Sequence, residues 1–184
     1  MVLAVDEHHP RRILGGVVFE CYRRSRSGFL TYLVVDEPAR RRGLGKALLQ
    51  RAEEWVRRHG AEVPWLYAET EDPRRLDDDR SAGVDRLRAL SRLGFLGCDL
   101  PYVQPPLGAG QPYVDSLVLL VRPLSAPVIV GAPAVERFLH EFYEAQGCAP
   151  PERDAHFRTM AAWLAGHDPV STFQLDTLLT PDGR

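Results

Sequence analysis

The stretch DEPARRRGLGKALLQRAEEW, residues 36–55, places three arginines and two glycines directly before a segment with apolar periodicity. Apolar residues recur at helical spacing from Leu44 to Val56, which predicts an amphipathic helix that ends at Gly60. The free N–H groups and positive dipole end of a helix start form an anion site, and Gly43 and Gly45 leave that backbone open to phosphate oxygens. The pattern alone is equally typical of a solvated helix start with surface arginines.

Two common phosphate-binding motifs do not fit this turn. A Walker loop needs a glycine at position 40 and a serine or threonine at position 47, where this chain has arginine and alanine. A dinucleotide fingerprint needs a third glycine where this chain has Leu48. What remains is a turn of the form Arg-x-x-Gly-x-Gly between a strand and a helix, and its geometry suits a pyrophosphate.

The sequence on either side of this turn indicates alternating strands and helices. Residues 12–22 and 29–37 are rich in β-branched and aromatic residues and are joined by a short polar link, which predicts an antiparallel hairpin. Further expected elements are a strand at 64–70, a charged loop at 71–83, a helix through 84–93, two strands around the link 105–112, helices at 133–146 and 151–165, and an extended piece in the tail.

Composition narrows the classes of function. A chain of 184 residues with a net charge of −2 suits one domain with a modest appendage, and it gives no sign of a nucleic-acid or membrane partner. The three cysteines form no close pair and show no metal-ligand spacing, so we expect no metal and a cytoplasmic location. No apolar run approaches the ~20 residues of a membrane span, and the first residues are too polar for a secretory signal.

Three motifs of this chain resemble, in order and spacing, those of the GNAT superfamily of acyl-CoA-dependent N-acyltransferases. They are the turn Arg40-Arg41-Arg42-Gly43-Leu44-Gly45, the YAET of the following strand and the later LGF at 93–95. The resemblance covers residues 12–121. It implies an α/β fold of the α+β type, with a mixed, mostly antiparallel sheet and flanking helices. It also implies a catalytic core over 11–122 and a C-terminal helical extension, 123–184, that packs on the core. The elements that normally precede the first strand are short or missing.

The resemblance implies acetyl-CoA as co-substrate, with its pyrophosphate on the backbone of the turn. The strand at 29–36 would bulge near Val34 and Val35 and splay from the strand at 64–70, and pantetheine would lie between them. The Val35 N–H would stabilise the oxyanion that forms on the thioester. The residues expected to bind the co-substrate are Val34, Val35, Arg40, Arg41, Arg42, Gly43, Leu44, Gly45 and Lys46.

Glu69 matches the place where many of these enzymes keep a glutamate, so it is the expected general base that takes a proton from the acceptor amine. Asp36 and Glu37, at the end of the other strand, are second choices. Carboxylates around this region favour a cationic acceptor, which would be a small-molecule amine or a protein amino group.

In the GNAT superfamily a tyrosine often protonates the leaving thiolate, and this chain has Leu90 at that position. An asparagine is also frequent in these enzymes, and this chain has Gly83 in its place. Tyr102 or Tyr113 could supply the proton instead, as could water, although both tyrosines also fit packing or rim roles. The C-terminal helices, from the same chain or from the partner chain of a homodimer, are expected to complete the acceptor pocket in place of the missing N-terminal elements.

Three functions are therefore compared. The leading one is an N-acetyltransferase that uses acetyl-CoA, with direct attack of a primary amine in a ternary complex. The alternative is a catalytically inactive acyl-CoA-binding sensor or interaction module, which the missing tyrosine and missing N-terminal elements favour. The third is a nucleic-acid binder that uses the arginines at 40–42, and the near-neutral net charge argues against it.

Overall fold

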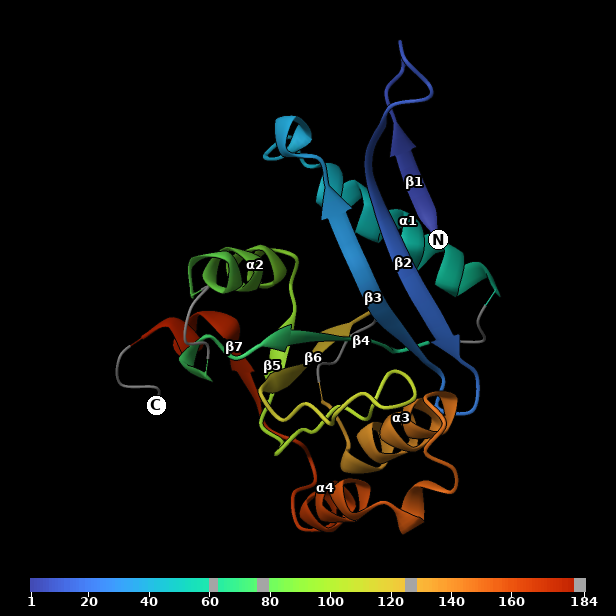
Figure 1. Cartoon of the computed structure of the whole chain (residues 1–184), viewed down its shortest axis with the longest axis vertical. Helices are drawn as coiled ribbons and strands as arrows, with labels where there is room; N and C mark the ends of the chain where they lie inside the picture. Colours follow the sequence, from blue (N-terminus) through green and yellow to red (C-terminus); the bar gives the residue numbers. More distant parts are fainter. Residues whose placement is uncertain (60–62, 76–79, 125–128, 181–184) are drawn as a thin grey trace.

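The computed structural model describes residues 1–59, 63–75, 80–124 and 129–180. It shows a single mixed sheet whose strands lie in the order β1-β2-β3-β4-β6-β5-β7, with helices on both faces (Figure 1). The strands are β1 (Val2–Val5), β2 (Ile13–Tyr22), β3 (Ser27–Val35), β4 (Trp65–Glu71), β5 (Leu96–Cys98), β6 (Leu117–Pro123) and β7 (Thr172–Gln174). The α-helices are α1 (Leu44–His59), α2 (Arg80–Arg92), α3 (Ala132–Ala145) and α4 (Ala155–Ala165).

This architecture confirms the expected α+β class. Among the strands that the structure describes, only the β3–β4 pair is parallel, and the other pairs are antiparallel. The first strand, β1, was not predicted, because four residues are too few for an apolar pattern to show. The stretch after Gly94 forms a strand only at β5, and Gln104 then makes an isolated bridge with Val114. Residues 76–79 of the predicted charged loop lie outside the described residues.

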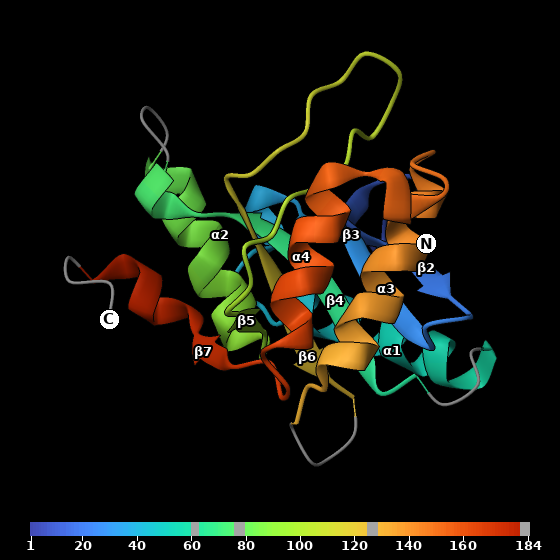
Figure 2. The same cartoon turned by 90° about the horizontal axis from the view of Figure 1, so that it is seen from below.

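The sheet separates two apolar clusters because successive strand residues point to opposite faces. On β4, Leu66 and Ala68 pack in the cluster under α1 and α2, whereas Trp65 and Tyr67 pack in the cluster under α3 and α4. Figure 2 shows α3 and α4 side by side across this second face. The Phe138 ring of α3 stacks on the Tyr67 ring with a centroid distance of 4.1 Å. The two C-terminal helices therefore share a core with the central strand.

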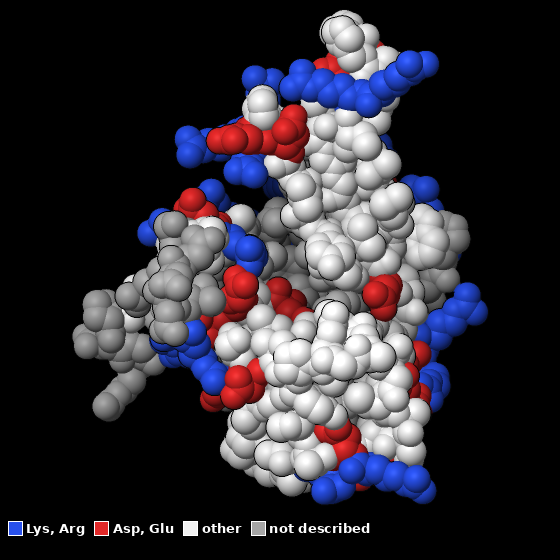
Figure 3. Space-filling model, viewed as in Figure 1, with Lys and Arg blue, Asp and Glu red and all other residues white. Residues whose placement is uncertain are grey.

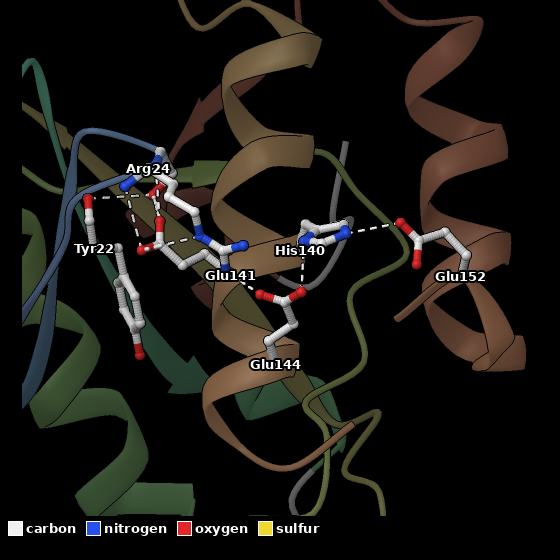
Figure 4. Close-up of polar contacts among 7 residues, drawn as sticks. Tyr22, Arg24, His140, Glu141, Glu144 and Glu152 are labelled. Atoms are coloured by element: carbon white, nitrogen blue, oxygen red, sulfur yellow. Dashed lines mark hydrogen bonds and ion pairs between the residues drawn. The ribbon is translucent and has the colours of Figure 1, made fainter. Parts of the chain in front are cut away.

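Polar contacts also fasten α3 to the turn between β2 and β3 (Figure 4). The Ser25 N–H and hydroxyl both donate to the Glu141 carboxylate, at 2.8 and 2.9 Å. The Arg24 guanidinium pairs with Glu144, and His140 Nε2 lies 2.7 Å from a Glu152 oxygen. A carboxylate that accepts several donors at one turn fixes the position of the helix that carries it. None of the described helices is long and apolar enough to cross a membrane.

The strands β3 and β4 diverge part-way along their length. Their parallel pairing starts at Ser27 and Trp65 and ends at Leu30 and Ala68. Beyond that point β3 continues to Val35 beside β2, whereas β4 continues to Glu71 beside β6. The predicted splay of these two strands is therefore present.

The predicted bulge near Val34 and Val35 is wrong in position. The register of β2 against β3 shifts between Val18 and Phe19, which leaves Thr31 as the extra residue of β3. An extra residue bends its strand and increases the local twist. Thr31 directly follows the last β3 residue that pairs with β4, so the bulge lies where the two strands separate.

Candidate functional site

The predicted anion-binding turn lies between β3 and α1 and presents a row of free donors. Among the described residues, no acceptor takes a hydrogen bond from the backbone N–H groups of residues 41–46. The first N–H group of this region that makes a helical hydrogen bond is that of Ala47, which donates to the Gly43 carbonyl. Arg41 and Gly43 both have positive φ, 63° and 79°. Alternation of left- and right-handed residues turns successive N–H groups toward one point and forms an anion-binding concavity. A Cβ on Gly43 would meet open space, so the backbone there is accessible.

The basic side chains of this turn divide into two groups. The Arg40 Nε donates to the Val35 carbonyl at 3.1 Å, so Arg40 ties the turn back to the end of β3. Arg41, Arg42 and Lys46 are exposed and form no ion pair with a carboxylate in the described part of the chain. These three side chains are therefore available to an anionic ligand.

The end of β3 offers a backbone donor toward the side that β4 has left. The Asp36 N–H donates to the Leu14 carbonyl at 2.8 Å, which makes the neighbouring Val35–Gly15 pair a non-hydrogen-bonded one. In such a pair the N–H and C=O groups point away from the partner strand. The Val35 N–H therefore points into the splay, and its role as an oxyanion donor stays a prediction. Val34 pairs with Gly16, and its side chain is exposed on the opposite face from α1.

Glu69 lies on β4, directly after the last residue that pairs with β3. One carboxylate oxygen accepts a hydrogen bond from the Tyr102 hydroxyl, and the other accepts one from the Gln104 amide. Burial raises the pKa of Glu69 to about 7, although both hydrogen bonds act in the opposite direction. A carboxylate with a pKa near neutrality is suited to accept a proton at physiological pH. Figure 3, which has the same view as Figure 1, shows acidic side chains in a hollow between the positions of α2 and β3.

The two tyrosines proposed as proton donors have carboxylate partners. The Tyr102 hydroxyl is buried, and burial together with Glu69 raises the pKa of Tyr102 well above 10. Tyr113 donates to Asp154 at the start of α4, and this bond raises the pKa of Tyr113 as well. Both hydroxyls therefore hold their protons tightly at neutral pH.

Other residues considered from the sequence form no hydrogen bond with Glu69 in the described part of the chain. Asp36 pairs with Arg12 at 3.6 Å, and Glu37 begins the short turn after β3. Leu90 is buried in the apolar cluster under α1 and α2, and Gly83 lies within α2. Of these candidate bases, Glu69 is the one that accepts hydrogen bonds from both the Tyr102 hydroxyl and the Gln104 amide.

Sequence reasoning missed a second oriented carboxylate, Glu20. It lies on β2 opposite Phe29, which pairs in turn with Tyr67, so its side chain is on the same sheet face as Glu69. The Tyr22 hydroxyl donates to Glu20 at 2.6 Å and Thr31 donates at 3.4 Å. No described lysine or arginine pairs with it. Only the register of three strands places Glu20 and Glu69 on the same sheet face, and no local sequence signal shows this.

Part of the chain is similar in sequence to a known protein family. Residues 2–76 match the acetyltransferase (GNAT) family. No curated protein sequence matches the chain. Similar solved structures include nourseothricin acetyltransferase, with 22% identity and a TM-score of 0.48, where the alignment covers 67% of this chain and 64% of that one.

A GNAT-family acetyltransferase from Staphylococcus aureus Mu50 aligns with 19% identity, a TM-score of 0.45, and coverage of 67% and 66%. The ribosomal-protein-S18-alanine N-acetyltransferase from Escherichia coli aligns with 19% identity, a TM-score of 0.39, and coverage of 64% and 65%. The aligned part of this chain spans slightly less than two thirds of each of these three proteins. The match to the acetyltransferase (GNAT) family is confined to residues 2–76, which contain β1 to β4 and the anion-binding turn.

Proposed function

We propose that this protein transfers an acetyl group from acetyl-CoA to a primary amine by direct attack within a ternary complex. The observation that carries the proposal is the splay of β3 from β4, because three groups lie on or directly after the two strands that separate there. These are the free N–H row of residues 41–46, the outward N–H of Val35, and the partly buried carboxylate of Glu69. Each suits a different part of one acyl-transfer reaction.

The turn would hold the pyrophosphate of the co-substrate. Its N–H groups and the dipole of α1 favour an anion, and the exposed Arg41, Arg42 and Lys46 add positive charge around it. The remainder of the co-substrate would then extend along the unpaired edge of β3 toward Val35. Residues 11–122 would form the catalytic core, and the extension 123–184 would contribute one wall of the acceptor pocket, since α3 packs on the β4 face that carries Tyr67.

Glu69 would accept a proton from the acceptor nitrogen, directly or through water, so that the neutral amine can attack the thioester carbon. The Val35 N–H would stabilise the negative charge that develops on the thioester oxygen. The carbon–nitrogen bond forms and the carbon–sulfur bond breaks, and the thiolate leaves. Since a thiol has an ordinary pKa of about 8.5, solvent suffices to return a proton to the sulfur.

The acceptor is proposed to be a cationic amine, either a small molecule or a protein amino group. Glu20 and Glu69 lie on one sheet face without a cationic partner among the described residues, so an ammonium group would find uncompensated negative charge there. Their donors are hydroxyl and amide groups, which orient the carboxylates without neutralising them.

The test is release of free thiol from acetyl-CoA over a panel of monoamines, diamines and lysine peptides. The wild-type protein should release thiol with at least one cationic amine, and Glu69→Gln should lower kcat by 10²-fold or more. Calorimetry should show that this variant binds acetyl-CoA as tightly as the wild type. A protein that neither binds acetyl-CoA nor releases thiol would refute the proposal.

A catalytically inactive acyl-CoA-binding module is the second candidate. Leu90, which replaces the usual proton-donating tyrosine, is buried in an apolar cluster and has no polar group to offer. Tight acetyl-CoA binding with no thiol release over the whole amine panel would favour this function over catalysis.

A further inference from the structure

The carboxylate of Glu69 is held by two residues of one short segment, residues 102–104. The Tyr102 hydroxyl donates to one oxygen and the Gln104 amide donates to the other. No cation among the described residues forms an ion pair with Glu69. Each carboxylate oxygen has two lone-pair directions, so one direction on each oxygen stays free for a proton or a substrate.

The segment that carries both donors is itself fixed. Gln104 exchanges two backbone hydrogen bonds with Val114, at 2.8 and 3.1 Å. These bonds close the base of the loop that connects β5 to β6 in the sequence and projects at the top of Figure 2. Between the two donors, the Val103 carbonyl accepts a hydrogen bond of 2.6 Å from the Tyr143 hydroxyl of α3. The Val103 N–H lies 3.5 Å from the Met160 sulfur of α4. Both C-terminal helices therefore hold the residue that lies between the two donors.

We propose that Tyr102 and Gln104 are positioning residues for Glu69, and that α3 and α4 hold them in place through Val103. The inference rests on the proposed role of Glu69 as the base. It gives the C-terminal extension a part in the reaction that is distinct from lining the acceptor pocket.

Uncharged hydrogen-bond donors suit a carboxylate that acts as a general base. A cation beside the carboxylate would stabilise its charged form strongly and lower the pKa below its ordinary value, which would make Glu69 a weak base. Burial without donors would raise the pKa further and leave the carboxyl group protonated at pH 7. One hydroxyl and one amide moderate the effect of burial and also fix the carboxylate plane.

The first experiment removes each donor with little change of volume, in Tyr102→Phe and Gln104→Met. Tyr113→Phe and Gln111→Met are matched controls, since Tyr113 donates to Asp154 and Gln111 is exposed in the same loop. The pKa of Glu69 is read by NMR titration of its labelled carboxyl carbon, which is assigned by its absence in Glu69→Gln. Each donor variant should raise this pKa by about one unit, and the controls should leave it unchanged.

Tyr102→Phe and Gln104→Met should also move the acid limb of the pH profile of kcat/KM to higher pH, by the same amount as the pKa of Glu69. A rise from about 7 to about 8 leaves roughly one fifth as much carboxylate at pH 7, so kcat/KM should fall about fivefold there. Acetyl-CoA affinity should be unchanged, because neither side chain belongs to the turn at 41–46. Circular dichroism confirms that each variant is folded at the temperature of the assay.

The second experiment tests the helices with Tyr143→Phe, which keeps the ring but removes the bond to Val103. Its effect on the Glu69 pKa should have the same sign and be smaller, and it should be non-additive with Gln104→Met. A Glu69 pKa that stays unchanged in folded Tyr102→Phe and Gln104→Met would overturn the inference. If the pKa rises in both but Glu69→Gln retains full activity, the proposed base is wrong, whereas the positioning of its carboxylate stands.

Discussion

Replacing Glu69 with glutamine should lower activity and, at alkaline pH, stabilise the fold. In the native state burial raises the pKa of this carboxyl from its ordinary 4.5 to about 7. The unfolded chain exposes the carboxyl and restores the ordinary value. Between these two pKa values the native state binds more protons than the unfolded state, so the free energy of unfolding falls as pH rises through this range.

The structure gives the size of this effect. Since each pKa unit corresponds to about 1.4 kcal/mol, the difference between 4.5 and about 7 amounts to about 3 kcal/mol of stability lost once Glu69 is charged. Glutamine does not titrate and occupies nearly the same volume. Its amide can still accept from the Tyr102 hydroxyl and donate to Gln104 with a rotated amide group, so the local hydrogen bonds survive.

The assay is urea unfolding of both proteins at several pH values between 4 and 9. The difference in unfolding free energy, Glu69→Gln minus wild type, cancels the titration of every other group. It should increase in favour of the variant from pH 4.5 to about 7 by about 3 kcal/mol and then stay constant. A difference that does not change with pH would show that the native pKa of Glu69 is ordinary, and the reasoning on its role as base would then fail.

Three further predictions concern the acceptor face and the C-terminal helices. Glu20→Gln should raise the KM of a cationic acceptor several-fold without changing acetyl-CoA affinity, and an unchanged KM would remove Glu20 from the acceptor site. Phe138→Ala should lower the unfolding free energy by about 3–5 kcal/mol, because its ring stacks on Tyr67; a loss below about 1 kcal/mol in urea titrations would contradict this packing. Glu141→Ala should cost about 1–3 kcal/mol, since it leaves the Ser25 donors without their acceptor, and wild-type stability would argue against that contact.

The parts of the fold that depend on local pattern were predictable from the sequence. The helix at Leu44, the hairpin of β2 and β3 and the turn before α1 follow from periodicity and from glycine placement within about 50 residues. The splay of β3 from β4 was expected from the resemblance. The bulge that accompanies it lies at Thr31, because it depends on the register of two strands rather than on any residue type.

The parts of the site that depend on tertiary contacts were not predictable in the same way. Glu69 was singled out by its place on a strand, but its raised pKa requires the burial that α3, α4 and the segment 102–104 create together. Gln104 carries no sequence signal for a role beside Glu69, because 35 residues separate the two in the chain. Tyr102 was considered as a proton donor, and only the structure shows that its proton is directed at Glu69.

Binding of acetyl-CoA to Gly43→Glu, measured by calorimetry beside Gly110→Glu, tests the assignment of the turn most directly. Both glycines have a φ of 79°, and a Cβ at either would meet open space, so the two variants carry the same backbone strain and differ in position. We expect Gly43→Glu to abolish binding, because the introduced carboxylate would occupy the pyrophosphate position and repel the pyrophosphate. Gly110→Glu should bind acetyl-CoA like the wild type. Equal affinity of Gly43→Glu and wild type would show that the free N–H groups of residues 41–46 do not hold the co-substrate.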